Sequence, residues 1–337
     1  MPNLNITIID IAKQLNISPS TVSRALRNHP DINPDTKSKI LSVADELRYN
    51  PNRLAQSLKS KITKTIGIIV PEIKHEFFSS VISGIEHMGY SSGYSILLTQ
   101  SNEDYQREIM NTKTLLSHRV DGILVSVSEN TVDVDHFKSV MKNKVPLVFF
   151  DRVSADLQCA TVECDDYHGA FTAVEHLIQR GYKRIAHVAG YEHTSIGKSR
   201  LRGYRDALSK HGIPFDPQWV RYGGLNEEDG IKAFESLFGE GKIPDAFFAV
   251  NDPVAVGLFM KIKEKGLKIP DDIALVGFSD NSISSLLDPP LTTVRQPAYK
   301  MGEMASRVLI DQLESTIEFE NTKHLLLETE LIIRKST

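Results

Sequence analysis

The sequence predicts a small all-α head followed by a larger α/β core built from doubly wound parallel sheets. Residues 7–47 place apolar side chains at helical spacing behind good capping residues. From Thr65 onward, short apolar strands alternate with helical stretches. The chain has 337 residues, which exceeds one typical domain, so we expect two or three folded units.

The charge distribution separates the head from the core. Residues 1–64 contain ten Lys and Arg and five Asp and Glu, which gives this segment a charge of about +5. Because the whole chain carries −4, the remaining residues carry about −9. A basic head on an acidic body is the asymmetry expected when only one part of a protein meets nucleic-acid phosphates.

Two short helices joined by a tight turn are predicted in the head. Thr7 and Asp10 form a capping-box start signal for the first helix. Ser18 is a good N-cap for the second, and Pro19 suits its first position. The apolar faces consist of Ile8, Ile11, Ala12 and Leu15, then Val22, Ala25 and Leu26. A helix-turn-helix of this kind inserts its second helix into the DNA major groove.

A third helix is predicted to begin at Asn33-Pro34 and to pack on the first two. Its apolar face consists of Ile40, Val43, Ala44 and Leu47. From the pattern alone, a small three-helix bundle with incidental charge remains the alternative to a DNA-binding head.

Four segments resemble the signature of the lactose-repressor (LacI/GalR) family of DNA-binding transcription regulators. They are Thr7–Lys13, Ile17–Leu26, Leu47–Asn52 and Ala55–Leu58. The resemblance implies that Pro19, Ser20 and Arg24 read bases, and Arg24 can donate two hydrogen bonds to one guanine. Side chains expected to hold phosphates, which position the protein without reading sequence, are Thr7, Ser18, Thr21, Ser23 and Asn28.

Residues 51–64 are predicted to form a hinge helix and linker after a DNA-binding domain at 1–50. Seven helix-compatible residues cannot sustain a helix alone in water, so a plain linker is the alternative. In the family, this segment folds on DNA, pairs with its dimer mate and wedges a leucine into the minor groove. The resemblance assigns these contacts to Asn52, Ala55, Leu58 and Lys59.

The core, residues 65–337, is predicted to form two lobes. Candidate strands are 66–70, 95–99, 122–127, 147–150, 184–189, 246–250 and 273–278. Candidate helices include 78–89, 106–118, 167–180, 199–210 and 253–265. Strands that alternate with helices indicate parallel sheets, and the region is long for a single one.

Further segments of the core resemble the effector-binding core of the same family. They include Thr65–Pro71, Val120–Ile123, Val276–Phe278 and Pro290–Pro297. The resemblance implies a two-lobed fold like that of periplasmic binding proteins, with chain crossings near 161, 291 and 322. Lobe 1 would comprise about 65–161 and 291–321, and lobe 2 about 162–290 and 322–337.

Ligands of open α/β sheets bind beyond the carboxyl ends of the strands. This rule and the family resemblance together select Phe77, Phe78, Asn102, Asp151, Arg152, Arg200, Asn251 and Ser279 as effector-binding residues. Carboxylate, guanidinium and amide groups suit a polyhydroxylated ring, which favours a sugar or sugar phosphate over a purine or another metabolite.

The sequence departs from the family at two pocket positions. The family commonly has Asn-Pro where this chain has His75-Glu76, and an acidic residue where Ser279 stands.

No catalytic, cofactor or metal site is expected. Cys159 and Cys164 lack the spacing of a zinc site. Gly197-Lys198-Ser199 has Glu192 where a phosphate-binding loop needs glycine. We therefore expect a regulator rather than an enzyme, such as a sugar kinase fused to a DNA-binding domain.

The partners expected from the sequence are operator DNA, a sugar-like effector and a second copy of the chain. The sequence begins without a secretory signal and contains no long apolar run, which predicts a cytoplasmic protein without membrane contact. A secreted solute-binding protein, which the core alone would suggest, is disfavoured for the same reason.

Overall fold

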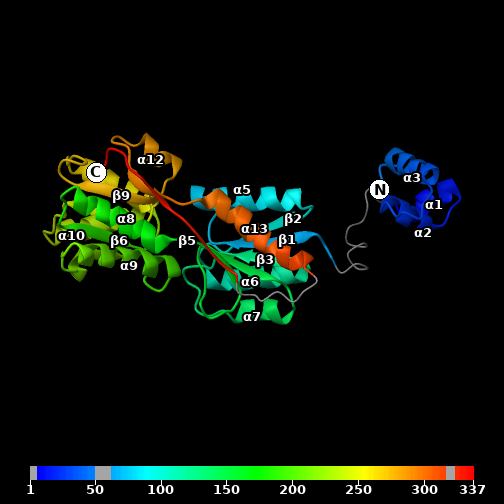
Figure 1. Ribbon diagram of the computed structural model, residues 1–337, viewed down its shortest axis with the longest axis horizontal. Helices are drawn as coiled ribbons and strands as arrows, with labels where there is room; N and C mark the ends of the chain where they lie inside the picture. The colour runs from blue at the N-terminus through cyan, green and yellow to red at the C-terminus, as the bar shows by residue number, and fades with distance from the viewer. Residues whose placement is uncertain (1–5, 50–61, 316–322) are drawn as a thin grey trace. The chain divides into compact units, whose positions relative to one another are not determined.

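The computed structural model of the chain describes residues 6–49, 62–315 and 323–337. The chain divides into two compact units, Met1–Thr63 and Lys64–Thr337. Figure 1 shows helices in the described part of the first unit and sheets flanked by helices in the second. The predicted hinge residues Asn52, Ala55, Leu58 and Lys59 lie outside the described residues.

The helical head contains α1 (Ile8–Leu15), α2 (Pro19–Leu26) and α3 (Pro34–Glu46). These elements confirm the three predicted helices. The Thr7 side chain and the Asp10 carboxylate form a capping box at α1, and the Ser18 side chain accepts a hydrogen bond from the Thr21 amide at α2. The predicted apolar faces meet in one core, whose buried members are Ile11, Ala12, Val22, Ala25, Ile40 and Ala44.

Lobe 1 of the second unit is built on a six-stranded parallel sheet in the order β11-β5-β4-β3-β1-β2. Its strands are β1 (Thr65–Val70), β2 (Ser95–Gln100), β3 (Gly122–Val125), β4 (Leu147–Phe150), β5 (Ala160–Cys164) and β11 (His324–Leu327). One face packs on α5 (Glu76–Ser91) and α13 (Ala298–Glu314). The other packs on α6 (Tyr105–Ser117) and α7 (Asp135–Lys142).

Lobe 2 contains a second sheet in the order β12-β10-β9-β8-β6-β7. Its strands are β6 (Ile185–Ala189), β7 (Val220–Tyr222), β8 (Ala246–Ala249), β9 (Ala274–Ser279), β10 (Thr292–Arg295) and β12 (Glu330–Ile332). All pairs are parallel except β10 with β12. The two faces pack on α8 (Asp166–Gln179) with α9 (Ser195–Lys210), and on α10 (Glu227–Gly239) with α11 (Asp252–Glu264). A short helix, α12 (Ser282–Leu286), follows β9.

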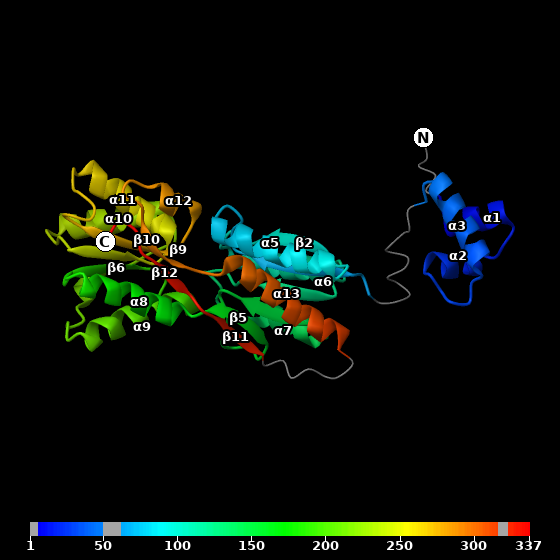
Figure 2. The same cartoon turned by 45° about the horizontal axis from the view of Figure 1, so that its top comes forward.

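The chain passes between the lobes three times, a few residues later than predicted. β5 and β11 belong to the sheet of lobe 1, and β10 belongs to that of lobe 2. The crossings therefore fall after residues 164, 295 and 327, instead of near 161, 291 and 322. The predicted boundary near 161 falls inside β5, where Val162 still pairs with Phe150. The boundaries near 291 and 322 precede β10 and β11, and each of these strands stays in the sheet of the lobe that the chain is about to leave. Figure 2 shows the red segment with β11 and β12 running from one lobe to the other.

Paired glycines let the helices that cover each sheet approach closely. A Cβ atom on Gly84 of α5 would collide with the Tyr299 carbonyl of α13, and one on Gly302 of α13 with the Val81 carbonyl of α5. Figure 2 shows these helices on the same side of the lobe 1 sheet. The close crossing fixes the N-terminal ends of both helices, which face the gap between the lobes.

Candidate functional site

One exposed face of α2 carries the predicted base-reading residues. Pro19, Ser20 and Arg24 are exposed, while Val22 and Ala25 on the opposite face are buried. The spacing of 19, 20 and 24 puts these three side chains on one side of the helix. The Ser18 hydroxyl lies 2.7 Å from the Ser20 hydroxyl and therefore orients it.

The predicted phosphate-contacting residues differ from one another in exposure and in hydrogen bonding. The Thr7 hydroxyl donates to the Asp10 carboxylate over 2.7 Å, and this bond lowers the pKa of Asp10. Asn28 accepts a hydrogen bond from the Lys37 ammonium group, which places a positive charge beside it. Ser18 is exposed, whereas Thr21 and Ser23 are half-buried.

In the core, Asp151 and Arg152 follow β4 at its carboxyl end and are buried. The Arg152 Nη1 atom donates to Glu103 Oε1 over 2.7 Å, and its Nε lies 3.9 Å from Asp151 Oδ2. The Ser126 hydroxyl donates to Asp151 over 3.3 Å. Burial raises the pKa of Asp151 to about 6, although Arg152 opposes the increase.

A second buried pair comes from lobe 2. Arg200 of α9 donates from Nε and Nη2 to Asp166 Oδ1, over 2.9 and 2.7 Å, and from Nη1 to the Val250 carbonyl over 2.5 Å. Its guanidinium carbon lies 3.7 Å from the centre of the Phe278 ring. The charge of Asp166 raises the pKa of Asp151 across the gap between the lobes, and the charge of Arg200 lowers it.

A third group of polar side chains closes one side of the gap between the lobes. The His193 ring of lobe 2 lies in hydrogen-bond contact with the Glu129 carbonyl of lobe 1. Burial, together with the charges of Glu103 and Asp229, raises the pKa of the Glu129 carboxyl to about 7. On the same side, the Ser195 hydroxyl accepts a hydrogen bond from the Val153 amide over 3.3 Å.

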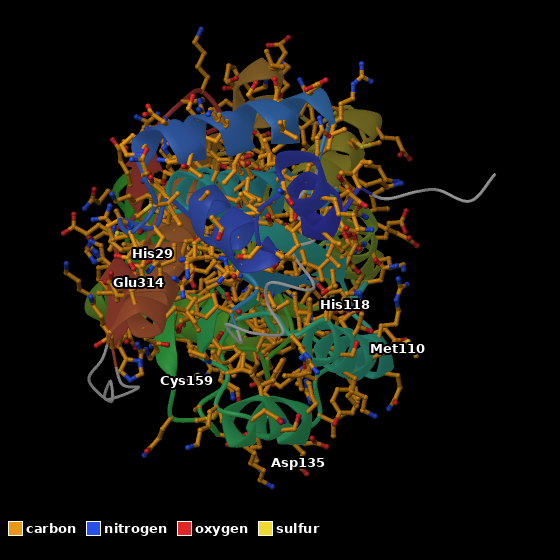
Figure 3. All side chains as sticks on the ribbon, turned by 90° about the vertical axis from the view of Figure 1, so that its right-hand side faces the viewer. His29, Met110, His118, Asp135, Cys159 and Glu314 are labelled. Atoms are coloured by element: carbon orange, nitrogen blue, oxygen red, sulfur yellow. The ribbon has the colours of Figure 1, made fainter. Side chains whose placement is uncertain are left out.

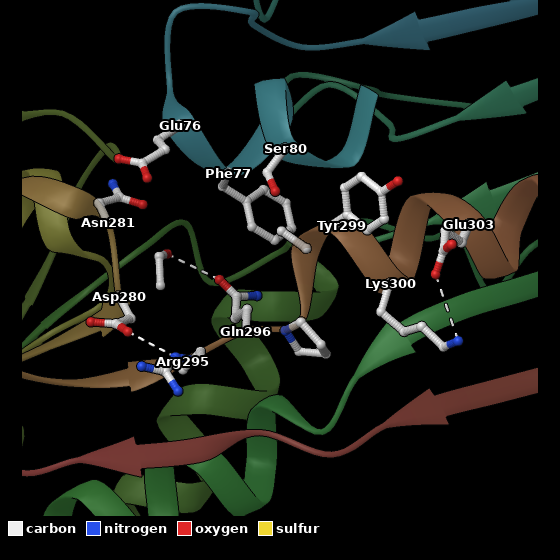
Figure 4. Close-up of a pocket in the computed structure, with 13 residues that line it drawn as sticks. Glu76, Phe77, Ser80, Asp280, Asn281, Arg295, Gln296, Tyr299, Lys300 and Glu303 are labelled. Carbon is white, nitrogen blue, oxygen red and sulfur yellow. Dashed lines mark hydrogen bonds and ion pairs between the residues drawn. The ribbon is translucent and has the colours of Figure 1, made fainter. Parts of the chain in front are cut away.

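A pocket of about 450 Å³ lies on the other side of the gap (Figure 4). Phe77 and Tyr299 supply aromatic surface from lobe 1, and Ser279 and Asp280 come from lobe 2. The Ser279 hydroxyl donates to the side-chain amide oxygen (Oε1) of Gln296 over 3.0 Å. Because Gln296 lies in the second crossing, this pocket adjoins the segments that connect the lobes.

Glu76 joins the lobes at the edge of this pocket. Its Oε2 atom accepts from the Ser282 amide over 2.8 Å and from the Ser282 hydroxyl over 2.7 Å. Ser282 opens α12, where the Asn281 side chain makes no capping bond. Glu76, which departs from the family pattern, therefore caps α12 of the opposite lobe.

The structure separates the predicted effector residues into three groups. Asp151, Arg152 and Arg200 meet between the lobes, and Phe77 and Ser279 line the pocket. Phe78 is buried in the lobe 1 core, with its ring 5.8 Å from the Arg152 guanidinium carbon. Asn102 is exposed and bonds to Gln100, and Asn251 uses its amide to cap α11 and to bond the Leu225 carbonyl.

Several residues of the site were not predicted from the sequence. Asp166 follows β5, so the rule about strand ends would have selected it if that strand had been recognised. Glu103 is adjacent to the predicted Asn102, and it is the Glu103 side chain that reaches Arg152. No local pattern indicated that Glu129 or Gln296 belongs to the site, because their positions depend on how the lobes meet.

An exposed helix-turn-helix face and a two-lobed core with charged groups between its lobes define a ligand-binding transcription regulator. Residues 7–52 match the model of bacterial regulatory proteins of the lacI family, and residues 174–337 match a periplasmic binding protein-like domain. The HTH-type transcriptional repressor CytR of Escherichia coli K12 is 34% identical over 98% of this chain and 96% of its own length. The chain belongs to the LacI family of transcription regulators.

Solved structures show the same fold over nearly the whole chain. The lac repressor dimer bound to operator and the anti-inducer ONPF superimposes with a TM-score of 0.87, at 27% identity, covering 98% of each chain. The complex of the transcriptional regulator CelR with cellobiose gives a TM-score of 0.74 at 28% identity, covering 98% of this chain and 100% of that one. In the part of this chain that the structure describes, no helix is long and apolar enough to cross a membrane.

Proposed function

We propose that this protein is a transcriptional repressor whose operator affinity is set by a small molecule bound between the lobes of its core. The observation that carries the proposal is that buried charged pairs of both lobes flank a direct contact between them. The Val153 amide, next to Arg152, donates to the Ser195 hydroxyl over 3.3 Å, and Ser195 opens the helix that carries Arg200. A ligand that contacts both pairs stabilises one relative orientation of the lobes. Effector binding and operator binding both depend on the equilibrium between orientations of the lobes. The two affinities are therefore reciprocally coupled, typically by about 1–3 kcal/mol.

The proposed DNA contacts are those of α2 and its flanking residues. Arg24, Ser20 and Pro19 read base edges in the major groove, while Thr7, Ser18, Thr21, Ser23 and Asn28 hold phosphates. The minor groove is contacted by the hinge residues, which are Asn52, Ala55, Leu58 and Lys59. The related lac repressor, whose structure contains operator DNA, supports this arrangement.

The proposed effector is sugar-like and contacts Phe77, Asp151, Arg152, Arg200 and Ser279. An aromatic face accepts the C–H surface of a sugar ring, and charged or hydroxyl groups fix its hydroxyls. The CelR structure with cellobiose is consistent with such a ligand. Phe78, Asn102 and Asn251 then act by supporting the cleft, since their side chains pack in the core or bond locally.

The proposed active form is a homodimer that contacts its partner through the β2 edge of lobe 1. β2 is the last strand of its sheet, and apolar side chains surround it. Tyr90 of α5 is 78% exposed, Met110 of α6 66% and Leu98 of β2 38%. Figure 3 shows Met110 on the surface of α6. Exposed apolar surface of this kind marks interaction sites, and two heads can then read a near-palindromic operator.

Two further proposals complete the assignment. The protein acts in the cytoplasm, where its operator DNA is, and it carries out no chemical reaction on its effector. The proposal that it carries out no reaction is supported by the pairing of Arg152 with Glu103 and of Arg200 with Asp166. These pairs give both arginines a role in holding the cleft and its ligand.

The decisive experiment combines effector screening with operator binding. A sugar panel is screened by thermal shift, since a bound ligand raises the apparent stability of the core. The best ligand is then titrated into a complex with operator DNA, and we expect operator affinity to change at least fivefold. In Arg200→Ala, which also leaves Asp166 unpaired, we expect the ligand response to vanish while the head still binds DNA. Ligand binding that leaves operator affinity unchanged would contradict the proposal.

A further inference from the structure

Both cleft arginines are already paired with carboxylates of the protein. Arg200 uses Nε and Nη2 on Asp166 and Nη1 on the Val250 carbonyl, so its hydrogen-bonding edge toward lobe 2 is occupied. Arg152 has Glu103 at 2.7 Å and Asp151 at 3.9 Å. Tight phosphate binding commonly uses an arginine whose two parallel N–H donors are free to face the anion. The positive charges of this cleft are neutralised before any ligand enters.

Carboxylates outnumber these arginines in the same place. The Glu129 amide donates to the Glu103 carboxylate over 2.8 Å, and the charges of Glu103 and Asp229 raise the pKa of Glu129. Asp151 and Asp166 add two more carboxyl groups beside the arginines. Within the described residues, this group therefore holds five carboxyl groups and two guanidinium groups. Asp151 receives one side-chain hydrogen bond, from Ser126 at 3.3 Å. A buried carboxyl with so few donors is stabilised by a ligand that brings O–H or N–H groups.

The basic residues of the adjoining pocket of Figure 4 are also paired with carboxylates. Its acidic lining residues are Glu76, Asp280 and Glu303, and its basic ones are Arg295 and Lys300. Arg295 donates to Asp280 over 2.9 Å, and Lys300 lies 3.6 Å from Glu303. Arg334 also donates to Asp280, over 2.6 Å, so a ligand anion placed there would find these cations already paired with carboxylates.

Building on the proposed effector cleft, we propose that the effector is an unphosphorylated, hydroxyl-rich molecule, and that the cleft discriminates against the phosphate ester of the same molecule. The hydroxyl groups donate to Asp151, and the ring lies against Phe77. A phosphate group would bring two negative charges into a cleft of excess negative charge and limited solvent, where charge repulsion is strong. Charge, rather than size, then decides between a sugar and its phosphate.

The test uses matched pairs of ligands on the full-length protein. Glucose with glucose 6-phosphate and ribose with ribose 5-phosphate are titrated calorimetrically, and inorganic phosphate is titrated by thermal shift at constant ionic strength. We expect the unphosphorylated member of any binding pair to bind at least about tenfold more tightly. We also expect inorganic phosphate to give no saturable stabilisation of the wild-type protein.

The variant Glu103→Gln removes one negative charge and the ion pair of Arg152 while keeping the size of the side chain. We expect it to gain phosphate binding, or to narrow the preference for the unphosphorylated sugar at least threefold. Glu86→Gln, which removes an exposed carboxylate of α5, is the matched control and should leave the preference unchanged.

Equal or tighter binding of a phosphate ester by the wild-type protein would overturn the inference. So would saturable stabilisation by inorganic phosphate that is lost in Arg152→Gln. If no sugar binds but another uncharged metabolite alters operator affinity, the sugar assignment fails and the charge inference stands. If an anionic metabolite does so instead, the charge inference fails although the repressor function stands.

Discussion

Arg24 and Ser23 are adjacent on α2 but are expected to contribute differently to DNA binding. Arg24 is exposed on the face with Ser20, whereas Ser23 is half-buried near the helix surface. A guanidinium group can recognise one guanine through two hydrogen bonds, while a hydroxyl bound to phosphate reads no base.

We therefore expect Arg24→Ala to lose about 1–3 kcal/mol of discrimination between the operator and a variant operator. Ser23→Ala should weaken binding to both DNAs by a similar factor. Affinities for the two DNAs, measured at one fixed salt concentration, separate these results. Unchanged discrimination in Arg24→Ala would remove this residue from base reading.

Glu129 makes the stability of the core depend on pH. Burial and the neighbouring Glu103 and Asp229 raise its pKa from 4.5 to about 7, so the folded state holds a proton that the unfolded state releases. Between those two values the folded state binds more protons, and the contribution of this group to stability therefore rises as the pH falls.

Glu129→Gln removes this titration while keeping the shape of the side chain. We expect the variant to be more stable than wild type at pH 8, by about 2 kcal/mol after allowance for partial exposure. The difference should vanish about one pH unit below the unfolded-state pKa of 4.5, where Glu129 is protonated in both the folded and the unfolded wild type. Denaturant unfolding of the core at both pH values measures it, with Glu86→Gln as control. A constant difference across this range would show that Glu129 does not titrate as described.

At the scale of elements, the crossing of α5 and α13 depends on the absence of side chains at two positions. Gly84 and Gly302 each face a backbone carbonyl of the other helix, and no Cβ atom fits there. The crossing also positions Phe77 and Tyr299, which come from the N-terminal parts of these helices and line the pocket.

We expect Gly302→Ala to push α13 away from α5 and to destabilise the core by about 1–3 kcal/mol, the usual cost of overpacking. Gly239→Ala is the matched control, because nothing lies within 4 Å of a Cβ atom at Gly239 of α10. There the loss of backbone freedom in the unfolded chain should leave stability unchanged or slightly higher. Equal effects of the two substitutions in thermal unfolding would contradict the close-packing argument.

At the scale of the whole molecule, the two edges of the lobe 1 sheet differ in apolar surface. β2 at one edge has Tyr90, Leu98 and Met110 around it, whereas β11 at the other edge exposes Leu326. An isologous contact between copies, in which both use the same patch, would therefore form at β2.

We expect the double variant Leu98→Asp, Met110→Asp to shift the protein from dimer to monomer, because each copy of the contact would bury uncompensated charges. Operator affinity should fall at least tenfold, since each monomer reads one half-site. Leu326→Asp should leave both properties unchanged. Sedimentation velocity measures the oligomeric state, and a dimer that persists in the double variant would place the contact elsewhere.

The sequence determined the parts of this protein that depend on a few neighbouring residues. Ser18 and Pro19 start α2, the stripe from Ile8 to Leu15 forms one face of α1, and polar residues such as Asp151 follow a buried strand. Capping and hydrophobic periodicity act over one or two helical turns, so a local pattern is sufficient to predict them. The short strands β7 and β12, with three residues each, are too brief to carry such a pattern.

Only the tertiary structure decided which charges meet. Arg152 pairs with Glu103 across 49 residues of sequence, Arg200 with Asp166 across 34, and Ser282 with Glu76 across 206. Parallel strands gather their carboxyl ends at one edge, and three crossings bring two such edges together. These pairings depend on where each crossing falls, and a shift of a few residues at a crossing changes which side chains face the cleft. For that reason the sequence indicated an effector site, whereas the paired arginines and excess carboxylates emerged from the fold.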